Sequence, residues 1–144
     1  MRVILREAGE EYRIAGDRRI RTLEDAAEAA REIVTSDTEV MVVLCLNTKM
    51  GLMSSEIVTS GLLDSSLVHP REVFRSAVKN NSATIVLVHN HPSGDPTPSA
   101  EDIRITRQLV EAGKIIDIKV LDHVVVSPPN SRCSMREDGL VSFQ

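Results

Sequence analysis

Residues 83–102 read ATIVLVHNHPSGDPTPSAED, a short apolar run followed by a loop rich in proline and polar residues. An apolar run of this length, with valine and isoleucine, is typical of a buried strand. Ser99 followed three residues later by Asp102 is a capping pattern that begins a helix and places Asp102 in its first turn. The segment therefore predicts a strand-to-helix connection, a position where functional residues are often found.

His89 and His91 stand where the apolar run ends. Side chains alternate between the two faces of a strand, so residues two apart share a face. Two imidazoles on one face, together with the Asp102 carboxylate brought back by the proline-bracketed loop, make three ligands. Three protein ligands leave a fourth zinc position for water, as in hydrolytic zinc sites. We therefore expect a Zn²⁺ site with His89, His91 and Asp102 as the metal ligands.

The bland alternative is that both histidines are buried and hydrogen-bonded. The pairing on one face and the spaced aspartate favour the metal site. His123 has no ligand spacing to the cluster and is predicted to be structural, and His69 is expected in a loop. Asp95, between glycine and proline, is predicted to form a turn. Asn90 and Ser93 are expected to hold the loop through side-chain hydrogen bonds.

The composition indicates one globular domain. The chain has 144 residues, of which 42% are hydrophobic and 26% charged, enough for a single core. The sequence has no apolar run long enough for a membrane span and no signal-peptide core at its N-terminus, so a cytoplasmic location is expected. Cys45 and Cys133 form neither a disulfide framework nor a CxxC pair and are expected to be free thiols.

Charge and aromatic content argue against nucleic acid as the default ligand. The formal net charge is −4 and aromatic residues make up 2% of the chain. Proteins that bind DNA usually carry a basic face, and those that bind single strands stack bases on aromatic rings. Direct DNA binding is therefore less expected than another function.

The remaining patterns alternate between helices and strands. Helices are predicted at residues 23–35, where Thr22 and Asp25 form a second capping pattern, at 71–80, and from 99 to 111 with Gly113 as the C-cap. Strands are predicted at 40–46, 52–61, 83–88 and 119–126, a hairpin could form within 1–20, and a loop is expected at 64–68. This order predicts an α/β fold in which helices pack on the faces of a mixed sheet.

The spacing His89-x-His91-x7-Ser99-x2-Asp102 resembles the JAMM signature of metal-dependent JAB/MPN domains. The string HNHPSGDPTPSAEDIRIT, with LVHPREVFRSAVKNN before it and VLDHVVV after it, resembles the RadC family of bacterial proteins. The resemblance covers residues 37–144, which implies a flanking segment with one helix at 1–36 and a RadC-like JAB/MPN domain at 37–144. It also implies the JAB/MPN architecture, a cytidine deaminase-like fold of the α+β type with a curved mixed sheet flanked by helices.

The resemblance further implies a zinc-dependent hydrolase that cleaves an amide bond, in a peptide or isopeptide, with a glutamate as general base. In the JAMM pattern that glutamate opens the first core strand, and Glu39 stands there, 50 residues before His89. Glu56 in the next strand is the competing candidate, and Glu101 is expected to point away. Ser99 caps the helix and, by resemblance, also supports the water or the developing oxyanion.

The sequence also bears on three other functions. A zinc nucleobase deaminase would need H-x-E followed by P-C-x-x-C, a cysteine pair that this sequence lacks. A DNA-repair accessory role is the one under which the RadC family was named, but residues 1–36 are expected to be too short for the helix-hairpin-helix-like region of fuller members. A catalytically silent scaffold is the third. The substrate is not identified by these residues, and strand edges could pair in a homodimer.

Overall fold

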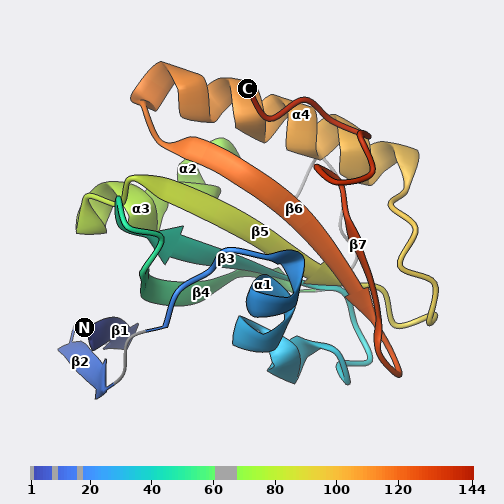
Figure 1. Ribbon diagram of the computed structural model, residues 1–144, viewed down its shortest axis with the longest axis horizontal. Coiled ribbons are helices and arrows are strands. Elements are labelled where there is room, and N and C mark those ends of the chain that lie inside the picture. The colour runs from blue at the N-terminus through green and yellow to red at the C-terminus, as the bar shows by residue number, and fades with distance from the viewer. Residues whose placement is uncertain (1, 8–9, 16–17, 61–67) are drawn as a thin grey trace.

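The fold is built around one mixed sheet with helices on both faces (Figure 1). The structure, a computed structural model, describes residues 2–7, 10–15, 18–60 and 68–144. Within these ranges the sheet has the strand order β4-β3-β5-β6-β7. Its strands are β3 Val40–Leu46, β4 Leu52–Ser60, β5 Thr84–Asn90, β6 Lys119–Ser127 and β7 Ser131–Ser134. The predicted α+β fold, a mixed sheet flanked by helices, is confirmed.

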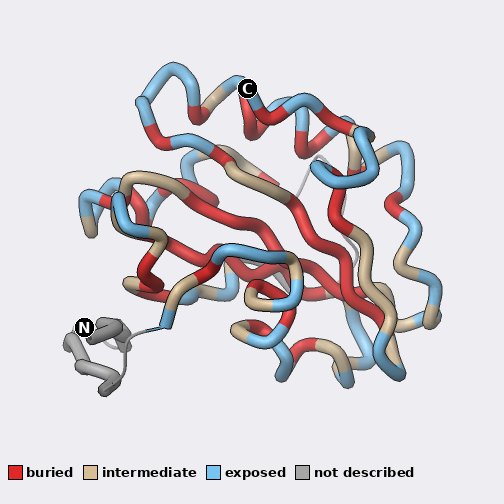
Figure 2. The backbone as a smooth tube through the Cα atoms, in the orientation of Figure 1, coloured by how far each residue is buried: buried red, intermediate tan, exposed pale blue. Residues whose placement is uncertain are grey.

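β3 and β5 form the centre of the sheet because their sequences are apolar on both faces. Every residue of β3 is buried, and β5 is buried from Ile85 onward. Alternate residues of β3 enter two separate cores: Met41 and Val43 face one, and Val42 and Leu44 face the other. Figure 2 shows buried backbone along the strands, with exposed residues mainly on the outer helices and connections.

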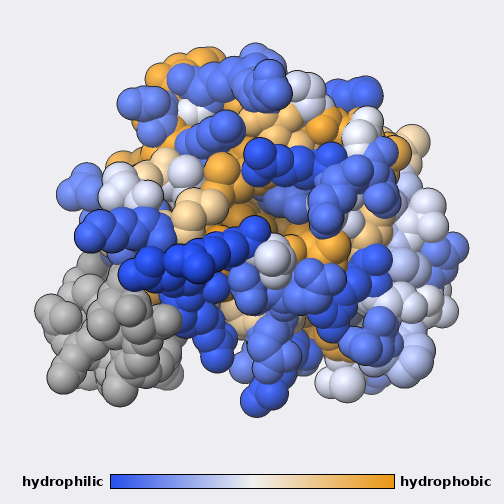
Figure 3. Space-filling view, in the orientation of Figure 1, coloured by the Kyte–Doolittle hydropathy of each residue, from blue (hydrophilic) through white to orange (hydrophobic). Residues whose placement is uncertain are grey.

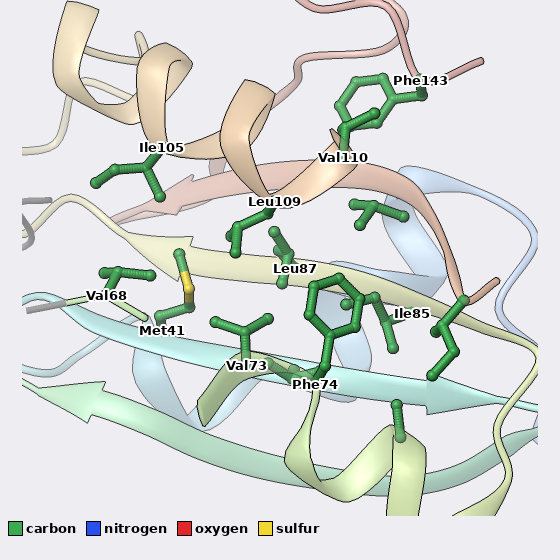
Figure 4. Packing of buried hydrophobic residues seen from close by; sticks show 14 of the residues in the cluster. Met41, Val68, Val73, Phe74, Ile85, Leu87, Ile105, Leu109, Val110 and Phe143 are labelled. Carbon is green, nitrogen blue, oxygen red and sulfur yellow. The ribbon is translucent and has the colours of Figure 1, made fainter. Parts of the chain in front are cut away.

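One face of the sheet is covered by α4, Ala100–Ile116, which connects the parallel strands β5 and β6. Ile105 and Leu109 of α4 point toward Leu87 and Met41 of the sheet, as Figure 4 shows. The capping box between Ser99 and Asp102 begins this helix as predicted. α4 thus begins near the C-terminal end of β5 and crosses the sheet to the start of β6.

The predicted C-cap at Gly113 is wrong. α4 continues to Ile116, and Asp117, at φ 59°, forms the left-handed cap. A Cβ at Gly113 would lie 2.4 Å from the carbonyl oxygen of Ile118 and 3.2 Å from the ring of Phe74. Glycine is needed at this position because the helix packs closely against its neighbours. In the sequence, this glycine looks the same as one that ends a helix.

The predicted helix at 71–80 is two short helices, α2 Pro70–Val73 and α3 Arg75–Asn80. Phe74 separates them and packs its ring into the core beneath α4 (Figure 4). The stop at Asn80–Asn81 is confirmed, since Asn81 caps α3 with φ 54°. His69 lies outside the helices at the N-cap position of α2, as expected for a loop residue.

The other face of the sheet carries α1, Leu23–Ala29, and the short 3-10 helix η1, Arg31–Ile33. The capping box of Thr22 and Asp25 begins α1 as predicted, but the α-helix ends at Ala29, short of the predicted residue 35. Its small residues Ala26 and Ala27 belong to the core on this face of the sheet. In the space-filling view of Figure 3, hydrophilic side chains cover most of the visible surface, and hydrophobic residues show between them.

The N-terminal hairpin is confirmed as β1 Arg2–Glu7 and β2 Glu10–Ala15, an antiparallel pair. Residues 8–9, between the two strands, and the loop predicted at 64–68, except for Val68, lie outside the described residues. Cys45 is buried and Cys133 is half-buried, and both are free thiols as expected. Within the described ranges, the helices lack the length and apolar character needed to cross a membrane. The boundary at residue 36 stays a prediction.

Candidate metal centre

The candidate centre lies where β5 ends beside the start of β3. The two strands are antiparallel with Met41 opposite His89. Glu39 precedes Met41 by two residues and His91 follows His89 by two, so alternation places both on the same face at the same level. Glu39 Oε1 lies 3.6 Å from His91 Nε2. Strand register, set by the apolar runs of β3 and β5, therefore brings Glu39 to the histidines.

The Nε2 atoms of the two histidines lie 3.0 Å apart. Asp102 Oδ1 lies 3.5 Å from His89 Nε2, and Asp102 Oδ2 lies 3.1 Å from His91 Nε2. In a tetrahedral zinc site with bonds of about 2.0–2.1 Å, ligand atoms are separated by about 3.3–3.4 Å. The spacing of these nitrogen and oxygen atoms is therefore close to that of three ligands around one ion.

Asp102 is held in place by the start of α4. The backbone N–H of Ser99 donates to Asp102 Oδ2 at 2.8 Å, and the N–H of Asp102 donates to Ser99 Oγ at 3.0 Å. The predicted capping role of Ser99 is thus confirmed. The same carboxylate caps the helix and faces both histidines, so the position of Asp102 depends on the helix rather than on a flexible side chain.

The cluster is buried on one side and open on the other. The side chains of His89 and Asp102 are 0% and 3% exposed, whereas those of His91 and Glu39 are 12% and 21% exposed. Burial alone would raise the pKa of Asp102, but the neighbouring imidazoles of His89 and His91 and the backbone N–H of Ser99 outweigh it and hold this pKa well below its usual range. The hydrogen bond to Asp102 raises the pKa of His91. Asp102 is therefore a carboxylate anion, the form that binds metals.

His91 is oriented by its own loop. Its Nδ1 lies 3.0 Å from the backbone carbonyl oxygen of Asp95. Because a carbonyl only accepts, Nδ1 carries a hydrogen, so in the neutral imidazole the lone pair of Nε2 faces the cluster. The Asp95 side chain accepts from the N–H of Thr97 at 3.0 Å, and the N–H of Asp95 donates to Ser93 Oγ at 3.3 Å. The turn role of Asp95 and the loop role of Ser93 are confirmed; the orienting role of the Asp95 carbonyl was not predicted.

Asn90 lies between the histidines in sequence, but its side chain lies on the opposite face of the sheet and does not hold its own loop. Asn90 Oδ1 accepts from the N–H of Val40 at 2.6 Å, and Asn90 Nδ2 donates to the carbonyl of Thr38 at 3.0 Å. The prediction that Asn90 holds its own loop is therefore wrong, because its partners are Val40 and Thr38. Asn90 fixes the backbone on both sides of Glu39.

His123 is the residue whose place the sequence did not predict. It is outside the ligand group, as expected, but its Nε2 lies 2.6 Å from His89 Nδ1. Its Nδ1 lies 2.5 Å from Thr106 Oγ1. Burial lowers the pKa of His123 well below its ordinary value. The contact follows from the parallel pairing of Leu87 with His123, a register that the spacing of histidines in the sequence does not reveal.

The competing glutamates lie elsewhere. Glu56 is on β4 opposite Val43 and does not belong to the group of possible ligands. Glu101 forms an ion pair with Arg104 on the outer side of α4, as expected for a residue that points away. Among the described residues, Glu39, His89 and His91 form a group with ligand atoms within 4.8 Å of one another, which could hold a metal ion.

Imidazole nitrogens and carboxylate oxygens at these separations are donors that suit zinc and similar divalent ions. The fold and the cluster together define the class of the protein, an α+β domain with a candidate metal site at the end of a central strand. Residues 20–140 match the family model described as RadC-like JAB domain, so the chain belongs to this family. The resemblance of the HNHPSGD segment to RadC proteins is thereby confirmed.

Several curated relatives carry the name UPF0758 protein, which states no activity. The one from Syntrophomonas wolfei subsp. wolfei is 51% identical over 127 residues, covering 85% of this chain and 54% of that protein. Those from Desulforamulus reducens and Thermotoga maritima are 50% and 46% identical over 105 and 109 residues, covering 73% and 76% of this chain and 46% and 49% of those proteins. The chain thus spans about half the length of the curated relatives it matches.

Proposed function

We propose that the chain is a zinc-dependent hydrolase domain that cleaves amide bonds, in a peptide or an isopeptide. His89, His91 and Asp102 are the proposed ligands and Glu39 is the proposed general base. The observation that carries the proposal is the convergence of the two Nε2 atoms and the Asp102 carboxylate at 3.0 to 3.5 Å, with Glu39 at the open side of the cluster.

The division of roles between the two carboxylates rests on their surroundings. Asp102 is buried, ionised and held by the capping box, which suits a permanent ligand. Glu39 is more exposed and its Oε1 lies 3.6 Å from His91 Nε2, which suits a group that must reach both water and substrate. A substrate would approach from the side of Glu39 and His91, because the opposite side is closed by the core.

A bound zinc ion would polarise the scissile carbonyl and lower the pKa of a water molecule. Glu39 then takes the proton of the attacking water and delivers it to the leaving amine, so the amine departs in its neutral form. The proposed second role of Ser99 is to stabilise the water or the developing oxyanion with its hydroxyl group, beyond its function as a cap.

The decisive experiment compares Glu39→Gln with Glu56→Gln, a matched change in the neighbouring strand outside the cluster. Zinc content is measured by elemental analysis, and hydrolysis is measured on a panel of peptides and isopeptide-linked substrates. We expect wild type and both variants to bind about one zinc ion per chain, and Glu39→Gln alone to lose about 10²- to 10⁴-fold in turnover.

Unchanged turnover in Glu39→Gln would remove its assignment as the base. A wild-type protein that binds no zinc, even when zinc is supplied, would overturn the hydrolase proposal as a whole. Asp102→Asn separates the carboxylates further, because it should lose zinc where Glu39→Gln retains it. Direct DNA binding stays the alternative, and a salt-dependent mobility shift of duplex or branched DNA would be its test.

A further inference from the structure

A continuous chain of hydrogen bonds runs through the core behind the candidate centre. Thr106 Oγ1 donates to the carbonyl oxygen of Asp102 at 2.7 Å and lies 2.5 Å from His123 Nδ1. His123 Nε2 lies 2.6 Å from His89 Nδ1. Thr106, His123 and His89 are each 0% exposed and Asp102 is 2% exposed. These groups are therefore shielded from bulk water, and their partners are other groups of the protein.

The direction of each hydrogen bond follows from counting hydrogens. A hydroxyl group has one hydrogen, and that of Thr106 is used on the Asp102 carbonyl, which can only accept. Thr106 Oγ1 must then accept from His123, so His123 carries its hydrogen on Nδ1. Two ring nitrogens at 2.6 Å share a single hydrogen. His123 is 0% exposed, and burial disfavours the charged imidazolium, so its Nε2 carries no hydrogen and can only accept. The donor is therefore His89 Nδ1.

This direction leaves His89 Nε2 without a hydrogen, and its lone pair points toward His91 Nε2 and Asp102. We propose that His123, directed by Thr106, is a positioning residue that fixes the tautomer of His89 and so makes its Nε2 a metal ligand. The inference rests on the proposed metal site. It does not depend on which bond the site cleaves.

A side chain is needed for this role because of where His89 lies. β5 is a central strand, and its neighbours β3 and β6 take up the backbone carbonyls around it in the sheet ladder. His91, one step beyond the ladder, obtains the same orientation from the carbonyl of Asp95. His123 thus provides the hydrogen-bond acceptor for His89 inside the sheet, as the carbonyl of Asp95 provides one for His91 in the loop.

The chain of bonds also returns to its origin. It begins at the backbone of Asp102, passes through Thr106 and His123 to His89, and His89 Nε2 lies 3.5 Å from Asp102 Oδ1. The start of α4 therefore determines two ligands, one directly through the Asp102 carboxylate and one through three hydrogen bonds.

The first test reads the hydrogens directly. Long-range ¹H–¹⁵N NMR on metal-free protein labelled with ¹⁵N-histidine, at about pH 8 where an ordinary imidazole is neutral, distinguishes the two ring nitrogens. We expect a hydrogen on Nδ1 of His123, none on its Nε2, and a hydrogen on Nδ1 of His89. A hydrogen on Nε2 of His123 would mean the opposite direction and would overturn the proposal.

The second test measures zinc affinity by competition with a chelator. His123→Phe keeps the ring volume but removes the acceptor, and we expect zinc to bind about 10- to 100-fold more weakly. His123→Gln places an amide oxygen where Nε2 stood and should restore most of the affinity, which a purely structural role would not explain. Thr106→Val removes the directing hydroxyl at nearly constant shape and should weaken binding to a lesser extent.

His69→Gln, a histidine change at the N-cap position of α2 and outside the proposed ligand set and hydrogen-bond chain, is the control and should bind zinc like wild type. If His123→Phe does not fold, the Gln and Val variants still decide the question. Wild-type affinity in a folded His123→Phe, or no rescue by Gln, would overturn the role of His123. Loss of zinc binding in the wild type itself would instead contradict the proposed function.

Discussion

The two histidines of the candidate centre are two residues apart but belong to different environments. His91 lies in a loop, its side chain is 12% exposed, and its Nδ1 partner is a backbone carbonyl four residues later. His89 is fully buried, and its Nδ1 partner is a side chain 34 residues later on another strand. In the proposed arrangement both histidines have an Nε2 without a hydrogen. For His91 the partner that causes this is local in the sequence, and for His89 it is supplied by tertiary structure.

The two environments should differ in how well they tolerate substitutions. A loop histidine that loses its partner can be solvated by water, whereas a buried network that loses one member leaves other polar groups unpaired. We therefore expect changes around His89 to cost folding stability as well as metal binding, and changes around His91 to cost chiefly metal binding.

The largest effect is expected from replacing the histidines themselves. Both His89→Ala and His91→Ala should abolish zinc binding, as measured by elemental analysis. Beyond the lost metal, His89→Ala should lower the free energy of unfolding by about 1–3 kcal/mol more than His91→Ala, because it leaves the buried Nε2 of His123 without its hydrogen-bond partner. Urea denaturation of the metal-free variants measures this, and equal stabilities would contradict the comparison.

Removing the metal from the wild type should affect the two environments unequally. At a free zinc concentration about 100 times its Kd, binding stabilises the fold by about 2.7 kcal/mol. After chelation we expect faster hydrogen exchange at loop amides such as those of Gly94 and Thr97, and little change in the amides of β5 and β6. Melting temperature and hydrogen exchange, with and without chelator, are the measurements. Uniform loosening of the whole sheet would contradict the prediction.

Asn90→Ala tests the residue that lies between the two histidines on the other face. It removes the acceptor of the Val40 N–H and should cost about 1–2 kcal/mol in unfolding free energy. We expect zinc to remain bound while turnover falls, because the backbone beside Glu39 is loosened and the ligands are not. Zinc content measured beside turnover separates the two, and loss of zinc would show that Asn90 supports the ligands instead.

The smallest effect is expected from Asp95→Ala. This change removes the side chain that accepts from Thr97 but keeps the backbone carbonyl that orients His91. The site is exposed, so the cost in unfolding free energy should be as small as for most surface substitutions. Zinc affinity, measured by chelator competition, should change only slightly. A loss of zinc affinity as large as that expected for His123→Phe would mean that the site is as sensitive to substitutions in the loop as to substitutions in the core.

The same contrast explains what the sequence could predict. The strand at Val40–Leu46 and the capping box of Ser99 and Asp102 are local patterns, and both formed as expected. The sequence pattern predicted a helix C-cap at Gly113, but glycine is required there by close contacts with Phe74 and Ile118. These contacts are tertiary, so the local sequence does not reveal them. The link from His123 to His89 depends on the register of two parallel strands, which alternation alone does not specify.

The carboxylate of Asp102 also bears on when the centre is assembled. Its Oδ2 completes the cap of α4, so the group stands in place as soon as that helix has formed. The proposed zinc ion would then meet an Asp102 carboxylate that the helix already holds in place. Metal uptake at the proposed site would therefore need no rearrangement of α4.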